Sequence, residues 1–294
     1  MHALFGPIKK VDRAQEQLKA LDIEIEEFLK ADRYGGVVAE FNRRTREHAL
    51  RLVTTGDGTP PLRWSLDIGE IAFNLRSALD HIAIQLALSV PGQKATDALY
   101  EKTQFPICLH GPDSSKRKRW RWKNGMSYIT YISRKHRAIL QGMQPYSRRD
   151  RKRARFGPFR GRVPLGRKHP LWLLREVNNA DKHRLLLVTA RVVSGMSLIV
   201  TEAPKGFKIE HVTFKAGMEL IHGAKIGSIR ITGNPHDVRM KFGVSPEVVF
   251  ASGCRAVKGL PVVGTLEAMH DEVDRVIRIL AAQFPPLGAT YPPD

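Results

Sequence analysis

The sequence contains little cysteine and no long run of apolar residues. Cys108 and Cys254 are its two cysteines, too few for a disulfide framework or a four-ligand zinc site. Both lie among apolar residues, so we expect buried, reduced thiols. No stretch of about 18 apolar residues is present, which excludes a transmembrane helix. The first residues lack the apolar core of a signal peptide, and we expect a cytoplasmic protein.

Recognised catalytic and phosphate-binding motifs are also missing. The sequence has no glycine-rich phosphate loop, no G-x-S-x-G element and no cysteine-based site. The stretch EAMHDEVD at residues 267–274 lacks the paired histidines of a zinc-binding helix and predicts a solvated helix face. We therefore expect no cofactor and no metal.

Acidic residues are nearly absent from residues 114–170. This segment contains 19 Lys or Arg and one carboxylate, Asp150, so it carries almost all of the net charge of +19. Such a local excess is typical of a surface that meets a polyanion, because phosphate contacts release counterions. We expect nucleic acid as the partner, with RNA favoured over DNA.

Two parts of this segment carry the charge. KRKRWRWK interleaves tryptophans with cations, and indoles can stack on unpaired bases while the cations bind phosphates. SRRDRKRARFGPFRGR reads as a low-complexity loop. The candidate nucleic-acid-binding residues are Lys116, Arg117, Lys118, Arg119, Trp120, Arg121, Trp122, Arg148, Arg149, Arg151, Lys152, Arg153 and Arg155. Alternatives are a solvated loop whose tryptophans cover the core, a loop with no fixed partner, and an anionic membrane surface.

Hydrophobic periodicity predicts an α+β protein that forms one domain over residues 1–294. Helical spacing of apolar residues predicts a helical core of about four helices, including residues 8–31, 65–89 and 170–188. Two short strands are expected at residues 37–41 and 48–54, and six short β-rich runs predict an attached antiparallel sheet. The expected parts are a mainly helical region 1–185 with a basic loop at 114–170, a sheet at 186–252, and a C-terminal helix at 262–283.

The helix at 65–89 contains the polar-rich stretch FNLRSALDHIAIQL. At 100° per residue it has two apolar stripes, one through Ile68 and Leu75 and one through Phe73 and Ile84, which predicts burial on two sides. Arg76 and Asp80 share one polar edge and can pair with each other. The other edge, with Asn74 and His81, needs a partner from another segment or a ligand.

The helix at 170–188 places Asp181 and Arg184 on its apolar side. Because an unpaired buried carboxylate is costly, we expect Asp181 to find a partner. The two helices are therefore predicted to share a polar seam, whose members are Asn74, Arg76, Asp80, His81, Asn178, Asp181 and Arg184. Such a seam is either a structural brace or a catalytic site.

Two resemblances follow from these residues. The blocks NLRSALDH, TQFPI, LQGMQPY and NNADKHR resemble those of an uncharacterised, largely actinobacterial protein family, over about residues 62–188. RSALDH also resembles the R-x4-H signature of HEPN-type ribonucleases, which are helical, often dimeric and metal-independent. This second resemblance implies His81 as the acid or base and Arg76 as the phosphate ligand. Asp181 or Asp80 would orient the imidazole.

Three hypotheses of function remain open. The first is a nucleic-acid-binding protein that uses its arginine-rich segment, and the second is a HEPN-like ribonuclease. The third is a non-catalytic interaction or scaffold protein. On a single helix Arg76 and His81 point about 140° apart, so the ribonuclease requires helix packing or a homodimer to bring the two side chains together.

Overall fold

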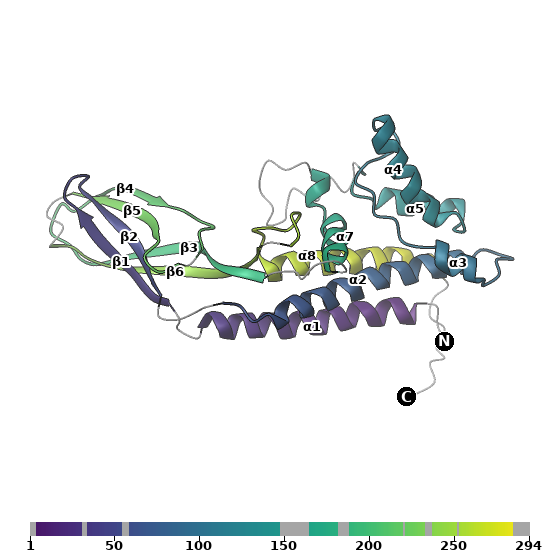
Figure 1. Cartoon of the computed structure of the whole chain (residues 1–294), viewed down its shortest axis with the longest axis horizontal. Coiled ribbons are helices and arrows are strands. Elements are labelled where there is room, and N and C mark those ends of the chain that lie inside the picture. Colours follow the sequence, from purple (N-terminus) through teal and green to yellow (C-terminus); the bar gives the residue numbers. More distant parts are fainter. Residues whose placement is uncertain are drawn as a thin grey trace.

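The chain forms an elongated molecule with helices at one end and β-sheets at the other (Figure 1). The computed structural model describes residues 4–30, 34–54, 59–147, 165–181, 188–219, 221–232, 237–251 and 253–284. The prediction of an α+β fold with antiparallel sheets and a C-terminal helix is confirmed. Within these ranges, no helix has both the length and the apolar character needed to cross a membrane.

Three long helices form the helical body: α1 (Phe5–Lys30), α2 (Arg63–Leu88) and α8 (Val262–Ala281). Figure 1 shows them side by side along the long axis. Helices α1 and α2 run antiparallel, because Gln17 bonds Glu70 near their middles while Glu24 bonds Arg63 towards one end. Helical spacing predicts an apolar stripe on α1 that ends at Phe28. Phe28 is half-buried, and the other five members are buried: Val11, Ala14, Leu18, Leu21 and Ile25.

Helix α2 lies at the centre of this body and packs against α1, α7 and α8. Ile68, Leu75 and the rest of its first apolar stripe are fully buried, as the periodicity predicts. The second predicted stripe is only partly correct. Ile84 packs against the core, but the Phe73 side chain is 53% exposed. The α2 surface around Phe73 is therefore open to solvent.

Shorter helices cover one side of α2. They are α3 (Asp97–Lys102), α4 (Lys116–Met126), η1 (Ser127–Ile129), α5 (Arg134–Gly142), η2 (Leu165–Lys168) and α7 (Pro170–Asp181). The expectation of a basic loop over residues 114–170 is wrong for α4, which is helical although its sequence, KRKRWRWKNGM, has no apolar stripe. Helix α7 starts with Pro170, a residue suited to the first turn of a helix.

Two antiparallel sheets form the other end of the molecule. The first has the order β1-β2-β5-β4, with β1 (Tyr34–Asn42), β2 (Glu47–Thr54), β5 (Lys225–Ile231) and β4 (Ile209–Phe214). The second pairs β3 (Val188–Glu202) with β6 (Arg239–Phe250). A second apolar core lies between the sheets and contains Leu50, Leu52, Val193, Ile226 and Ile229.

The sheet region differs from the predicted strands in two ways. The six expected β-rich runs form four strands, because β3 and β6 continue through Gly195 and Pro246. A register shift between Val193 and Gly195 accommodates these residues, and a proline is tolerated at such a bulge. In addition, β2 pairs with β5, so the hairpin before α2 belongs to the same sheet as strands from residues 186–252.

Candidate functional site

A cleft of about 1290 Å³ opens on the side of α2 that carries Phe73. Its walls come from α2, α4, α7, η2, the extended segment 103–109, His110 and the loop 255–260. Figure 1 shows α4 and α7 on the same side of the long helices. The cleft is larger than the 300–1000 Å³ typical of small-molecule sites, so it has room for an extended ligand.

The cleft is strongly cationic. Its lining in the described part of the chain contains two carboxylates, Asp80 and Glu176, against seven cations: Arg76, Arg121, Arg167, Lys168, Arg175, Arg255 and Lys258. Four of these cations, Arg121, Arg167, Arg255 and Lys258, are exposed and form no ion pair with any residue that the structure describes. Clefts lined by one sign of charge focus the field and attract ligands of the opposite sign.

His110 lines the cleft and is affected by the same positive charges. Burial lowers the pKa of this imidazole, and the nearby cations Lys118, Arg121 and Arg167 lower it further. Two of these cations come from α4 and one from η2, so the positive charges of both elements converge on one region. A bound anion would relieve this repulsion.

Helix α4 presents six exposed cations: Lys116, Arg117, Lys118, Arg119, Arg121 and Lys123. None of them has a carboxylate partner within the described ranges. Like charges at i,i+4 destabilise a helix, so α4 depends on tertiary contacts. Trp122 Nε1 donates to Tyr146 Oη at 3.1 Å, and Gly125 packs so closely on Cys108 that a Cβ there would lie 2.6 Å from the sulfur.

The two tryptophans of α4 differ in their surroundings. Two residues apart on a helix, they point about 200° away from each other. Trp122 is half-buried and anchors α4 through Tyr146, whereas the Trp120 side chain is 65% exposed. Both line the cleft. Trp120 therefore offers an indole face to a ligand, while Trp122 holds the helix in place.

Arg76 and Asp80 form the self-contained pair that their spacing predicts. Arg76 Nη2 lies 2.8 Å from Asp80 Oδ1 and also donates to the carbonyl of Phe105 at 2.9 Å. The same Asp80 oxygen accepts from the backbone N–H of Phe105 at 2.8 Å. The pair thus holds the extended segment 103–109 against α2. Arg76 is part of the cleft wall, but its guanidinium is already engaged.

Asn74 and His81 face α1 and lie away from the cleft lining. Asn74 Nδ2 donates to Gln17 Oε1 at 2.9 Å, so this edge of α2 takes its partner from another helix. His81 packs on Gly6 of α1, where a Cβ would lie 3.2 Å from Nδ1. Burial and the neighbouring Lys10 lower the pKa of His81. Arg76 and His81 therefore do not converge within this protomer.

Asp181 occupies a third location. Its carboxylate packs on Gly69, where a Cβ would lie 2.6 Å from Cγ, and burial raises its pKa. Gly69 lies seven residues before Arg76, which is about 10 Å along the helix. The structure therefore distributes the predicted seam among separate surroundings. Arg184 and the candidates Arg148, Arg149, Arg151, Lys152, Arg153 and Arg155 lie outside the described residues.

Several cleft residues were not found from the sequence. Arg255 and Lys258 lie in a short loop after β6 with no local motif. Arg175 stacks over Trp172, with its guanidinium carbon 4.8 Å from the ring centroid. The basic composition of residues 114–170 pointed to Arg167, but nothing in the sequence indicates that Arg167 lines the same cleft as Arg255.

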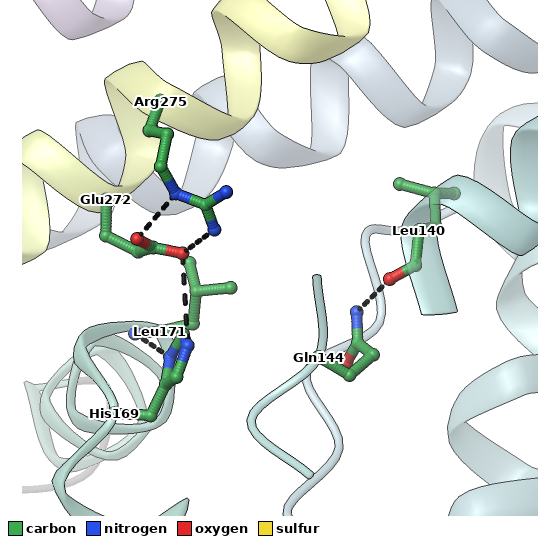
Figure 2. A network of polar contacts seen from close by, with 6 residues as sticks. All are labelled: Leu140, Gln144, His169, Leu171, Glu272 and Arg275. Atoms are coloured by element: carbon green, nitrogen blue, oxygen red, sulfur yellow. Dashed lines mark hydrogen bonds and ion pairs between the residues drawn. The ribbon is translucent and has the colours of Figure 1, made fainter. Parts of the chain in front are cut away.

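Buried polar contacts fix the walls of the cleft (Figure 2). His169, just before α7, accepts from the backbone N–H of Leu171 and lies 3.9 Å from Glu272 of α8. Arg275 binds the same carboxylate with two nitrogens. Near the end of α5, Gln144 donates to the carbonyl of Leu140 and accepts from the N–H of Cys108. These contacts tie α7 to α8 and segment 103–109 to α5.

The part of the chain that the structure describes contains no candidate metal site. Among the described residues, no group of three or more His, Cys, Asp or Glu side chains is arranged to hold a metal ion. Burial also raises the pKa of the Cys108 thiol to about 11. At neutral pH this thiol is protonated, which makes it a poor nucleophile and a poor metal ligand.

Comparison with known proteins gives no match: no protein-family model fits the sequence, and neither the curated proteins nor the solved structures contain a similar chain. The resemblances to the actinobacterial family and to HEPN-type ribonucleases therefore stay predictions. The function has to be argued from the cleft itself.

Proposed function

We propose that the protein binds single-stranded nucleic acid, with RNA favoured over DNA, in the cleft and along α4. The observation that carries this proposal is the set of exposed cations without carboxylate partners on α4 and on the opposite wall of the cleft. Phosphate contacts supply the affinity of such interfaces through counterion release.

Aromatic side chains favour a single strand over a duplex. Trp120 and Phe73 line the cleft, and more than half of each side chain is exposed. An exposed ring in a cationic groove is a platform on which an unpaired base can stack, worth about 1–3 kcal/mol per base. Bases inside a duplex do not offer their faces in this way. The cleft thus combines the two contacts that single-strand binders use.

The ribonuclease alternative receives less support from this geometry. Its proposed base, His81, packs on α1, whereas its proposed phosphate ligand, Arg76, is bonded to Asp80 and Phe105. Arg76 lines the cleft, whereas His81 is not part of its lining. Binding without turnover is therefore the function that we propose.

The direct test is the binding of a 20-nucleotide single-stranded RNA, measured by fluorescence anisotropy at several salt concentrations. The proposal predicts that log K falls with log salt with a slope of roughly −0.7 for each neutralised phosphate. Trp120→Ala should weaken binding by about 1–3 kcal/mol while the slope stays the same. The control is Tyr100→Ala, because Tyr100 is an exposed aromatic residue outside the cleft lining. Trp64 is buried and would not serve as a control.

Each possible result of this experiment supports or contradicts the proposal. The proposal is supported if binding weakens strongly with salt, if Trp120→Ala reduces the affinity, and if Tyr100→Ala leaves the affinity unchanged. Binding that does not depend on salt, or an equal preference for a duplex of the same length, contradicts it. Cleavage of the RNA in EDTA that His81→Ala abolishes would instead restore the ribonuclease hypothesis.

A further inference from the structure

We infer that Asn178 reads the edge of one unpaired base of the strand bound in the cleft. This inference rests on the proposed function and adds a base-selecting residue to it. The contacts proposed above, from cations and aromatic rings, recognise any sequence. The Asn178 amide is a different kind of group, because it can distinguish one base from another.

The position of Asn178 is unusual for a polar side chain. The residue is only 5% exposed, yet it belongs to the cleft lining. Its amide forms no hydrogen bond with any residue in the described part of the chain. Neither amide atom is among the fully buried side-chain atoms that lack a hydrogen-bond partner, so the amide is accessible from the cleft. Because the amide has no partner among the described residues, it can bond whatever fills the cleft.

The surrounding structure holds this amide in place. Its neighbours on α7, Leu174 and Val177, are fully buried, so this face of the helix is fixed against the core. His169 ties the start of α7 to Glu272 of α8 (Figure 2). Because α7 is anchored in this way, the Asn178 side chain is presented on a rigid element. Rigid presentation is what edge recognition requires.

The chemistry of an amide suits a base edge. Asparagine offers a donor, Nδ2, beside an acceptor, Oδ1, and this arrangement pairs in bidentate fashion with the N6 amino group and N7 of adenine. A phosphate oxygen only accepts, so it would leave Oδ1 without a partner. The Asn178 amide therefore fits a base better than it fits the backbone of the strand.

The neighbouring cleft residues can hold the rest of the nucleotide. Phe73 supplies an exposed ring, and Arg255 and Lys258 supply cations for the flanking phosphates. Since these contacts do not depend on base identity, they should contribute equally to every sequence. A preference for one base then has to come from groups such as Asn178.

The test compares the binding of ten-nucleotide oligo(A), oligo(U) and oligo(C) to the full chain by anisotropy. We expect the wild type to prefer oligo(A) by about 5- to 150-fold, the range of a good bidentate contact. Asn178→Ala should remove this preference without changing the salt slope. Gln141→Ala is the amide control, since Gln141 lies on α5 outside the cleft lining, and it should keep the preference.

Two additional measurements complete the test. Asn178→Leu keeps the branched shape and the number of side-chain heavy atoms but has no amide, so it tests base reading if Asn178→Ala does not fold. Adenosine monophosphate, titrated alone, shows whether the site takes a free nucleotide or needs a strand. Tight binding of the monophosphate, with no further gain from the oligonucleotide, would overturn the assignment to a strand.

Other results overturn the inference while the proposed function stands. The inference fails if the wild type binds the three oligonucleotides with equal affinity that falls strongly with salt. It also fails if the preference for oligo(A) remains in both Asn178 variants. If no oligonucleotide binds in a salt-dependent way, the proposed function itself fails and the inference fails with it.

Discussion

Several cations on the sheets and the long helices have carboxylate partners, whereas the cations of α4 have none among the described residues. On the sheets Arg51 bonds Glu40 at 2.7 Å and Arg230 bonds Glu47 at 2.8 Å. On α8 Arg278 bonds Asp274 at 2.6 Å. The six cations of α4 have no such partner in the described chain. The charges of these three arginines are locally neutralised, whereas the charge on α4 remains available to a ligand.

This difference has a cost in stability. A helix with six cations and no acid repels itself, and a few α4 contacts such as Trp122 to Tyr146 offset the repulsion. Proteins break such local rules mainly at functional sites. We therefore relate the unpaired charge of α4 to the proposed binding function.

The largest expected loss in the free energy of unfolding comes from removing the carboxylate partner of a cleft cation. Asp80→Ala leaves Arg76 without its carboxylate and Phe105 without its acceptor. Because the two side chains are 16% and 27% exposed, we expect a loss of about 2 kcal/mol, below the 3–5 kcal/mol of a fully buried pair. Chemical denaturation measures this. An unchanged midpoint would show that the pair does not brace segment 103–109.

A smaller effect is expected when α4 loses its anchor but keeps its charge. Trp122→Phe removes the hydrogen bond to Tyr146 and should cost about 1 kcal/mol. If the cations bind only as a positioned set, affinity for single-stranded RNA should also fall, although the net charge is the same. Tyr146→Phe removes the same bond from the other side and should give a matching loss. Full affinity in both variants would contradict the need for positioning.

Within α2 the comparison is between Arg76, at the cleft, and His81, against α1. Burial and Lys10 place the folded-state pKa of His81 below its ordinary value of 6.5. Protonation therefore favours the unfolded chain, and stability contributed by the neutral imidazole is lost as the pH falls below about 6.5. His81→Gln should flatten the dependence of unfolding on pH in this window. His110 and His136 also have lowered pKa values, so some dependence should remain.

The smallest effect on stability and on RNA affinity is expected when a cation far from the cleft loses its carboxylate partner. Asp274→Asn removes the partner of Arg278, which is 79% exposed, and raises the net charge by one. Exposed pairs contribute little, so stability should change by less than about 0.5 kcal/mol. RNA affinity should not rise. A clear gain in affinity would mean that net charge alone governs binding.

The sequence predicted the parts of the fold that depend on local pattern. The apolar stripe of α1 and the Arg76–Asp80 pair follow from helical spacing, and both are present. The separation of Arg76 from His81 also follows from the angle between them. Helix α4 was missed because alternating cations and tryptophans give no apolar stripe, and its helix is stabilised by distant contacts to Tyr146 and Cys108.

The sequence predicted one wall of the candidate site but not the other. The basic composition of residues 114–170 indicated a surface for polyanions, and α4 supplies one wall of the cleft. The other wall combines Arg175 of α7 with Arg255 and Lys258 from the loop before α8, which only the tertiary packing brings together. Asn178 appeared as a member of a polar seam, because its exposure to a cleft cannot be read from helical angle alone.

The central claim is that the unpaired cations of α4, and not the net charge of the chain, hold the nucleic acid. Two variants with equal loss of charge test it. One is Arg117→Gln with Lys118→Gln and Arg121→Gln on α4. The other is Arg43→Gln with Arg44→Gln and Arg46→Gln, three exposed arginines at the β1–β2 turn, at the opposite end of the molecule (Figure 1).

The measurement is the salt dependence of binding to a 20-nucleotide single-stranded RNA. We predict that the α4 variant loses about two units of slope, since each single-strand phosphate contact contributes roughly 0.7, and that its affinity falls at least about tenfold. The turn variant should keep the slope and most of the affinity of the wild type. Equal losses in the two variants would contradict the account.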